Sequence, residues 1–324
     1  MKTPRFWSSK NILSTLLLPA AGLYYLASRW RQAHTTPAVL SVPVICIGNL
    51  TTGGAGKTPV ALAIGEMLKA KHINAFYVSR GYGGSARGPL MVEPHTHSAA
   101  LVGDEPLLLA GVLPTVVGKN RLAAAEFAIA QGAEMIVMDD GFQNPTLAKT
   151  LSFIVVDRRL SFGNERLLPA GPLREPVKRG LSRAQALIIV NPANFLPTAL
   201  PAIPIIIARS HPHADALALS GKKILAFCGI AYPKKFYDML RNAGADIVEK
   251  ISFADHHRYS EKDIKRLREQ AKAQNLQLVT TAKDAARLPD GFKSEIHVAH
   301  MVLTFENSDI IDELIESARH AKKN

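Results

Sequence analysis

The segment Thr51-Thr52-Gly53-Gly54-Ala55-Gly56-Lys57-Thr58 decides the fold class of this chain. It follows an apolar run, Val42-Pro43-Val44-Ile45-Cys46-Ile47, that predicts a buried strand. Pro59, a residue tolerated in the first turn of a helix, comes next, and the apolar spacing of Val60–Ala70 predicts that helix. A strand, a glycine-rich turn and a helix in this order are the context that a phosphate-binding loop requires.

The residue types in this segment suit the binding of a nucleoside triphosphate. Glycines let backbone N–H groups surround the phosphates, and the start of the helix adds a favourable dipole. The ammonium of Lys57 would neutralise phosphate oxygens, and the hydroxyl of Thr58 would bind Mg²⁺. A glycine-rich turn without a ligand would explain the glycines but not Lys57-Thr58 behind them. We therefore predict that the nucleotide is bound by Thr52, Gly53, Gly54, Ala55, Gly56, Lys57, Thr58 and Pro59.

Strands alternate with helices along the rest of the chain. In the first half the apolar patterns predict strands at Ala75–Ser79, Met135–Met138 and Leu151–Val156 and helices at Leu107–Val112 and Asn120–Gln131. In the second half they predict strands at Ala186–Val190, Ile203–Ala208, Lys223–Phe227 and Leu276–Thr280 and helices at Pro233–Ala243, Glu261–Gln274 and Asp309–His320. Such alternation predicts an α/β fold with a mostly parallel sheet covered on both faces.

The length and the local composition suggest how the chain is divided. At roughly 100–200 residues per domain, the 324 residues are enough for two domains. Arginine and lysine gather among Gly and Pro between Asp157 and Arg183. We therefore predict a membrane-associated N-terminal segment over 1–34, a P-loop NTPase-like domain over 35–156, a basic linker over 157–183 and a second, smaller α/β domain over 184–324.

The N-terminal segment is apolar from Ile12 to Ala27. It is shorter than the ~20 residues that span a bilayer, and Pro19 and Gly22 interrupt it. Cationic residues flank it on both sides, and Trp7 and Trp30 bracket it where interfacial aromatic residues would lie. We predict a helix that lies on a membrane surface. A signal peptide and a hydrophobic helix packed on the protein are the alternatives.

The charge balance favours an anionic partner. Lysine and arginine total 39 against 27 acidic residues, which gives a net charge of +12 and a pI near 9.7. Nucleic acid, acidic lipid and a phosphorylated substrate all fit this excess, and composition does not choose among them. The two cysteines, Cys46 and Cys228, lie in apolar runs without metal-ligand spacing, so we expect buried thiols in a reducing compartment.

Three groups of polar residues carry further chemistry. The strand Met135–Met138 ends in Asp139-Asp140, an arrangement that delivers a carboxylate to Mg²⁺, although a turn or helix cap is also common there. Gly103-Asp104-Glu105-Pro106 places two acids before an apolar helix; this pattern alone favours a helix cap over a general base. Asp255-His256-His257 predicts a surface histidine, and a loop histidine that orients a catalytic acid is the alternative.

Taken together, these motifs resemble one family, the tetraacyldisaccharide 4'-kinases, which are the lipid A 4'-kinases of Gram-negative bacteria. The resemblance runs over nearly the whole chain. It is carried by GNL from Gly48 with GGAGKTP, SRGYGG from Ser79, GDEP from Gly103, DDGFQ from Asp139, LPAGPLRE from Leu168, ADH from Ala254 and TAKDA from Thr281. The family's loop also lacks the first glycine of the strict pattern, where this chain has Thr51. Asn144 and Ala282 depart from the family, which usually has His and Glu there.

The resemblance implies ATP-dependent phosphorylation of the 4'-hydroxyl of an acylated glucosamine disaccharide 1-phosphate, with ATP and Mg²⁺ as cofactors. It places the protein at the cytoplasmic face of the inner membrane, peripheral or monotopic. It implies that Asp104 is the catalytic base and His256 its partner, with Lys57 on the nucleotide. Mg²⁺ would be held by Thr58, Asp139 and Glu175, and the substrate by Arg80, Tyr82, Arg121, Gln143 and Arg174.

A different class of function stays open at this point. The basic composition also allows a P-loop NTPase that uses hydrolysis as a switch on nucleic acid or on a protein partner. The resemblance favours the lipid kinase. We therefore expect a lipid substrate and a membrane surface as partners, no nucleic acid, and no obligatory protein partner.

Overall fold

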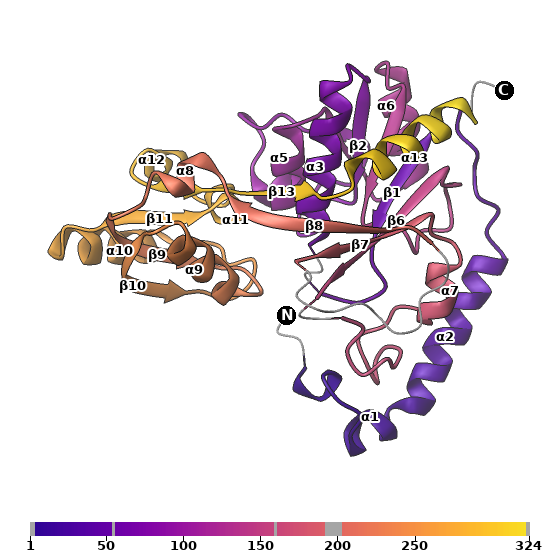
Figure 1. Cartoon of the computed structure of the whole chain (residues 1–324), viewed down its shortest axis with the longest axis horizontal. Coiled ribbons are helices and arrows are strands. Elements are labelled where there is room, and N and C mark those ends of the chain that lie inside the picture. The colour runs from indigo at the N-terminus through magenta and orange to yellow at the C-terminus, as the bar shows by residue number, and fades with distance from the viewer. Residues whose placement is uncertain (1–3, 54–55, 159–160, 192–202, 322–324) are drawn as a thin grey trace.

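The structure, a computed structural model, describes residues 4–53, 56–158, 161–191 and 203–321. It forms two lobes, each built around a β-sheet (Figure 1). The strands of the large sheet are β1 (Val44–Gly48), β2 (Ala75–Ser79), β3 (Leu90–Met91), β4 (Thr115–Val117), β5 (Met135–Asp139), β6 (Leu151–Asp157), β7 (Ala186–Val190), β8 (Ile205–Pro212) and β13 (Met301–Phe305). The small sheet contains β9 (Lys223–Cys228), β10 (Asp246–Ser252), β11 (Gln277–Thr281) and β12 (His297–Ala299).

Both sheets are mainly parallel. The large sheet has the order β13-β8-β7-β6-β1-β5-β2-β4-β3, and the small sheet has the order β10-β9-β11-β12. Antiparallel pairing occurs between β13 and β8 and between β3 and β4, whereas the other neighbours, including all those of the small sheet, are parallel. The prediction of an α/β fold with a mostly parallel sheet is therefore confirmed.

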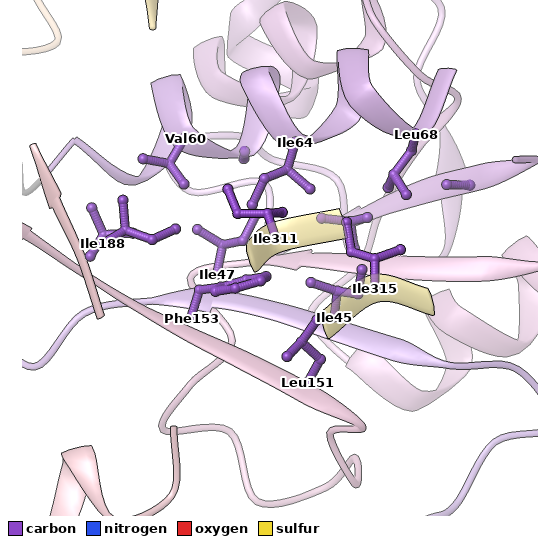
Figure 2. Close-up of a cluster of buried hydrophobic side chains, with 14 of the residues drawn as sticks. Ile45, Ile47, Val60, Ile64, Leu68, Leu151, Phe153, Ile188, Ile311 and Ile315 are labelled. Carbon is purple, nitrogen blue, oxygen red and sulfur yellow. The ribbon is translucent and has the colours of Figure 1, made fainter. Parts of the chain in front are cut away.

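Alternating side chains of the large sheet supply two separate cores, because successive residues of a strand point to opposite faces. On one face, α3 (Lys57–Ala70), α5 (Asp104–Ala110) and α13 (Ser308–His320) cover residues such as Ile45 and Phe153. Figure 2 shows Ile64 of α3 and Ile311 of α13 above these strands. On the other face, α6 (Arg121–Ala130) and α7 (Val177–Leu181) cover the intervening residues, such as Cys46.

The small sheet is covered in the same way. The helices α8 (Ala214–Leu217) and α9 (Pro233–Asn242) pack on one face, and α10 (Glu261–Ala273) and α12 (Asp290–Lys293) pack on the other. The short helix α11 (Ala282–Ala285) follows β11 directly. Both cysteines are buried and free, as the sequence predicts.

The sheets divide the chain differently from the predicted domain ranges. The predicted linker over 157–183 lies between β6 and β7, which are paired neighbours in the large sheet. Three strands from the predicted second domain, β7, β8 and β13, belong to that same sheet. The sheet boundary instead falls where β8 continues into α8 and where β12 returns to β13, and Figure 1 shows β8 and β13 running side by side toward the small lobe.

The N-terminal helices lie along the large lobe as a separate layer. A 3₁₀ turn, η1 (Arg5–Trp7), precedes α1 (Ile12–Leu16) and α2 (Leu18–Ala33), which is the indigo helix at the edge of Figure 1. Residues of the basic segment hold them: Arg166 donates to the hydroxyls of Ser14 and Thr15 at 2.7 and 2.9 Å. No helix in the described part of the chain combines the length and apolar content that crossing a bilayer demands. The two helices of this layer nevertheless expose large apolar side chains: Ile12, Leu13, Leu16, Leu18, Leu23, Leu26 and Trp30.

The core under α3 provides a test of the packing. Ile64 is fully buried between α3 and the large sheet. We expect Ile64→Ala to lower the free energy of unfolding by about 2–5 kcal/mol, because the substitution removes buried apolar atoms and leaves a cavity. Chemical denaturation followed by circular dichroism measures the loss. Ile12→Ala, at a side chain that is 81% exposed, is the control, and an equal loss in both variants would contradict the assigned core.

Candidate active site

The predicted functional residues meet where parallel strands end. Asn49 follows β1, Arg80 follows β2, and Asp139 is the last residue of β5, which lies between β1 and β2. The carboxyl ends of parallel strands open onto the crevice where α/β proteins bind ligands. Here a cleft of about 2190 Å³ is lined by residues of both lobes, including Lys57 and Asp104 of the large lobe and His256 of the small lobe.

The described residues of the glycine-rich segment lie between β1 and α3. Gly56 has a φ of 81°, in the region that favours glycine, and Lys57 begins α3. Thr51 is buried and forms a β-bridge with Leu173, and the N–H of Thr52 donates to the carbonyl of Pro172 at 2.8 Å. Position 51 is therefore part of a strand-like contact, which a residue other than glycine can make. The predicted ligand residues Gly54 and Ala55 lie outside the described residues.

Lys57 is oriented toward the end of β5. Its Nζ donates to Oδ1 of Asn49 at 3.2 Å and lies 3.6 Å from Oδ2 of Asp140. The guanidinium of Arg174 contacts the same Asp140 carboxylate through two hydrogen bonds of 2.8 and 3.2 Å, and it also donates to Gln143 at 3.2 Å. Paired arginine–carboxylate contacts fix geometry as well as charge. Two cations therefore converge on one carboxylate beside the loop, and together they keep the pKa of Asp140 below its usual range.

Asp139 differs from Asp140 in having little to neutralise it. The residue is 3% exposed, and among the described residues its Oδ1 has no hydrogen-bond partner. Burial, together with the charges of Glu105 and Asp140, raises the pKa of Asp139 to about 7. A buried oxygen without a partner is costly, so this carboxylate suits a cation. The described residues contain no group of three or more His, Cys, Asp or Glu side chains arranged to hold a metal ion.

Glu105 contacts both Thr58, at the start of α3, and the small lobe. Its Oε1 accepts a hydrogen bond from the Thr58 hydroxyl at 3.2 Å and another from Lys283 Nζ at 2.6 Å. Thr58 and Glu105 belong to the large lobe, whereas Lys283 lies on α11 of the small lobe. The ammonium of Lys283 counteracts the effect of burial on Glu105, so the pKa of that carboxyl is lowered.

Asp104 makes the second contact between the lobes. It is the first residue of α5; Gly103, with a φ of 94°, occupies the N-cap position, and Asp104 and Glu105 lie in the first turn. Its Oδ2 lies 3.1 Å from Nδ1 of His256 and 3.5 Å from Nε of Arg287. Asp104 is 4% exposed, so these small-lobe cations provide much of the stabilisation that water would give a carboxylate.

The contact between Asp104 and His256 shifts the pKa of both side chains. Burial raises the pKa of Asp104, but the hydrogen bond from His256 and the charges of His256, Lys283 and Arg287 together bring it below the usual range. The hydrogen bond to Asp104 raises the pKa of His256, against a smaller effect of burial. The contact therefore stabilises the charged forms of both side chains.

Three further predicted substrate residues, Arg80, Tyr82 and Arg121, also line the cleft. Arg80 is exposed, and Tyr82 is 68% exposed with its ring edge-on to His256 at 6.0 Å between centroids. Arg121 is 6% exposed, and among the described residues its Nε has no partner. Burial, and to a smaller extent Arg80, lower the pKa of Arg121 to about 10. Both arginines therefore gain from an anion in the cleft.

The structure brings together all of the predicted site residues that it describes, except Glu175. The carboxylate of Glu175 accepts hydrogen bonds from Gln143 and Arg183, and the residue does not line the cleft. Four residues that contact the site were given no role by the resemblance: Glu105, Asp140, Lys283 and Arg287. Three of them stand in motifs that carried the resemblance. Nothing in the local sequence distinguishes Arg287, which comes after TAKDA.

Known proteins and a family model are similar to this chain over most of its length. The family model for tetraacyldisaccharide-1-P 4'-kinase (LpxK) matches residues 13–319. A tetraacyldisaccharide 4'-kinase of Rhodospirillum rubrum is 42% identical over 322 residues, which is 98% of this chain and 97% of the relative. One of Parvibaculum lavamentivorans is 47% identical over 298 residues, or 89% of this chain and 87% of the relative.

The solved structures include a similar protein. A crystal structure of LpxK from Aquifex aeolicus in complex with ATP has a TM-score of 0.78 and 27% sequence identity, covering 95% of this chain and 100% of the other. The sequence match and the structural match both extend over nearly the whole length. The chain belongs to the tetraacyldisaccharide-1-P 4'-kinase family.

Proposed function

We propose that this protein transfers the γ-phosphate of ATP to the 4'-hydroxyl of a tetraacyl glucosamine disaccharide 1-phosphate, a step in lipid A biosynthesis. Family membership supports the reaction, and the ATP bound to the related Aquifex protein supports the donor. The observation that carries the proposal is the Asp104–His256 contact of 3.1 Å, formed between the lobes beside the loop that ends in Lys57-Thr58.

In this proposal Asp104 is the general base. The acceptor hydroxyl attacks the γ-phosphorus as its proton passes to the carboxylate, and the bond between the γ-phosphorus and the β–γ bridging oxygen breaks to release ADP. His256 shares the charge of the carboxylate and orients it, as expected of an acid–base pair within hydrogen-bond reach. Lys57 and Arg174 lie beside Asp140 and would meet the negative charge of the transferred group.

Thr58 and Asp139 are the proposed protein ligands of Mg²⁺. The unpartnered oxygen of Asp139 fits a cation, and Mg²⁺ is often held by one or two protein groups together with phosphate and water. When bound, Mg²⁺ would neutralise phosphate oxygens during transfer. Because Glu175 supports Gln143 and pairs with Arg183, we assign it a positioning role in place of the predicted metal role.

Arg80, Tyr82, Arg121, Gln143 and Arg174 are proposed substrate contacts. Arginines suit phosphate because their N–H groups can bind two oxygens at once. The exposed ring of Tyr82 beside His256 would pack on the sugar acceptor. We also propose that the two sheets mark two domains, with the large one comprising 35–212 and 301–321 and the small one 213–300.

The apolar face of α1 and α2 is the proposed contact with the membrane. Side chains such as Leu16, Leu23 and Leu26 are 71%, 70% and 64% exposed there. Helices with such a face and cationic flanks lie in the interface of a bilayer. A lipid substrate would then be met at the cytoplasmic face of the inner membrane by a peripheral or monotopic enzyme.

The role of Asp104 is tested by Asp104→Asn. We expect transfer of labelled phosphate to the lipid disaccharide to fall about 10²–10⁴-fold, because the amide cannot accept the hydroxyl proton. Binding of ATP, measured by calorimetry, should persist. Asp290→Asn, at a side chain that is 92% exposed, is the matched control. Full activity in Asp104→Asn would exclude the assigned base.

The pH dependence of stability follows from the same pair. The raised pKa of His256 adds stability that is present below about 6.5 and is lost as the pH rises through the folded-state value. The lowered pKa of Asp104 adds stability that is present above 3.8 and is lost at lower pH. The difference in thermal midpoint between the wild type and His256→Gln should therefore be largest between pH 3.8 and about pH 6.5. A difference that grows above neutral pH, or one matched by the exposed-site control His95→Gln, would contradict this.

Membrane binding provides a further test. We expect replacement of Leu16, Leu23 and Leu26 by serine to lower binding to anionic phospholipid vesicles at least about tenfold, because each buried leucine contributes roughly 1.5–3 kcal/mol. Co-sedimentation with vesicles measures the change. Serine at the exposed Leu217 and Val248 of the small lobe is the control. Unchanged sedimentation of the triple variant would exclude this face as the anchor.

A further inference from the structure

We infer that Arg287 is a positioning residue that holds both members of the Asp104–His256 pair, and the inference rests on the proposed role of Asp104. Arg287 lies just after α11 in the small lobe, and its side chain is only 6% exposed. Its Nε is 3.5 Å from Oδ2 of Asp104, the same oxygen that contacts His256 at 3.1 Å. Oδ2 of Asp104 therefore faces both the guanidinium of Arg287 and the imidazole of His256, which lies on a loop.

The same guanidinium also holds the loop that carries His256. Nη1 and Nη2 of Arg287 donate to the carbonyl of Gly229 at 3.1 and 3.2 Å, and Nη1 also donates to the carbonyl of His257 at 3.2 Å. The carbonyl of Gly229 accepts the backbone N–H of His256 at 3.1 Å as well. Arg287 thus contacts the His256 loop directly at the carbonyl of His257, and it shares with the backbone N–H of His256 the carbonyl of Gly229, which follows β9.

The conformation of His256 makes such support necessary. Its φ is 56°, in the left-handed region that a residue other than glycine adopts at a cost. Such a conformation persists where surrounding contacts determine it. The backbone N–H bond to Gly229 and the Arg287 bond to the neighbouring carbonyl are those contacts, so the imidazole is aimed at Asp104 by the guanidinium.

Polar groups of the small lobe in turn hold Arg287. Its Nη2 is 3.2 Å from Oδ1 of Asp284, which is fully buried, and its Nε donates to the carbonyl of Lys283 at 3.0 Å. Oδ1 of Asp284 also accepts the Tyr259 hydroxyl at 2.7 Å and the N–H of Gly229 at 2.8 Å. A methyl group on Gly229 would lie 2.9 Å from the carbonyl oxygen of Ala254 and 3.2 Å from Oδ1 of Asp284, so only glycine fits there without displacement. These contacts hold the guanidinium within the small lobe, and its Nε lies 3.5 Å from Oδ2 of Asp104 in the large lobe.

A double-mutant cycle tests this role. Arg287→Met keeps an unbranched apolar stem out to about the position of Nε but removes the rest of the guanidinium with its charge and donors. We expect kcat for lipid phosphorylation to fall about 100-fold, with the KM for ATP changed less than about threefold, because the reacting groups are misplaced while the nucleotide loop is intact. In a His256→Ala background the same substitution should lower kcat less than about threefold, because residues that act as a unit are not additive.

The controls separate positioning from folding. Arg241→Met removes an exposed arginine of the same lobe that pairs with Asp238, and it should leave kcat unchanged. Thermal unfolding reports the folded fraction of each variant; where Arg287→Met is unfolded, Arg287→Lys completes the cycle. An equal fold-loss in both backgrounds, or a raised KM with unchanged kcat, would overturn the inference. Asp104→Asn in the same assay distinguishes the two proposals: an active Asp104→Asn refutes the base, whereas an active Arg287→Met beside an inactive Asp104→Asn refutes only the positioning role.

Discussion

The carboxylates of Asp104 and Glu105 belong to the large lobe, and the cations that contact them belong to the small lobe. Asp104 is buried and Glu105 is half-buried, and a carboxylate that has lost water in this way is stabilised by a cationic partner. The start of α5, the loop after β1 and the turn around His256 must therefore come together for either lobe to satisfy its own charges. The proposed chemistry of the cleft depends on the same contacts, since they bring the proposed base Asp104, its partner His256 and the glycine-rich loop to one place.

Much of this arrangement could be predicted from short-range patterns. The strand, glycine turn and helix around Lys57 were predicted because each element has its own local signal, and Asp139 was placed at the end of β5 for the same reason. The long strings of motifs supplied Asp104 and His256, which local pattern alone would have left as a helix cap and a surface histidine. Their meeting across the lobes depends on the tertiary path of the chain, and no spacing in the sequence encodes it.

The division into lobes and the proposed role of Arg287 could not be predicted from short-range patterns in the sequence. The basic composition of 157–183 suggested a linker, but β6 and β7 on either side of it pair within one sheet, because sheet order is set by long-range packing. Arg287 has no motif of its own, and its importance comes from the carbonyl groups and carboxylates that surround it. For Glu175, in contrast, the motif predicts a metal ligand. In the structure its carboxylate accepts a hydrogen bond from Gln143 and pairs with Arg183.

One segment touches both the nucleotide loop and the N-terminal helices. Pro172 accepts the N–H of Thr52, Pro169 accepts the indole N–H of Trp7 at 3.0 Å, and Arg166 holds Ser14. On the proposed membrane face, this tie sets the height of the phosphate donor above the lipid surface. The distance between the membrane surface and the phosphate donor would then select the acceptor. A sugar headgroup whose 4'-hydroxyl lies at that distance can react while its acyl chains stay in the bilayer, and a shorter or longer headgroup cannot.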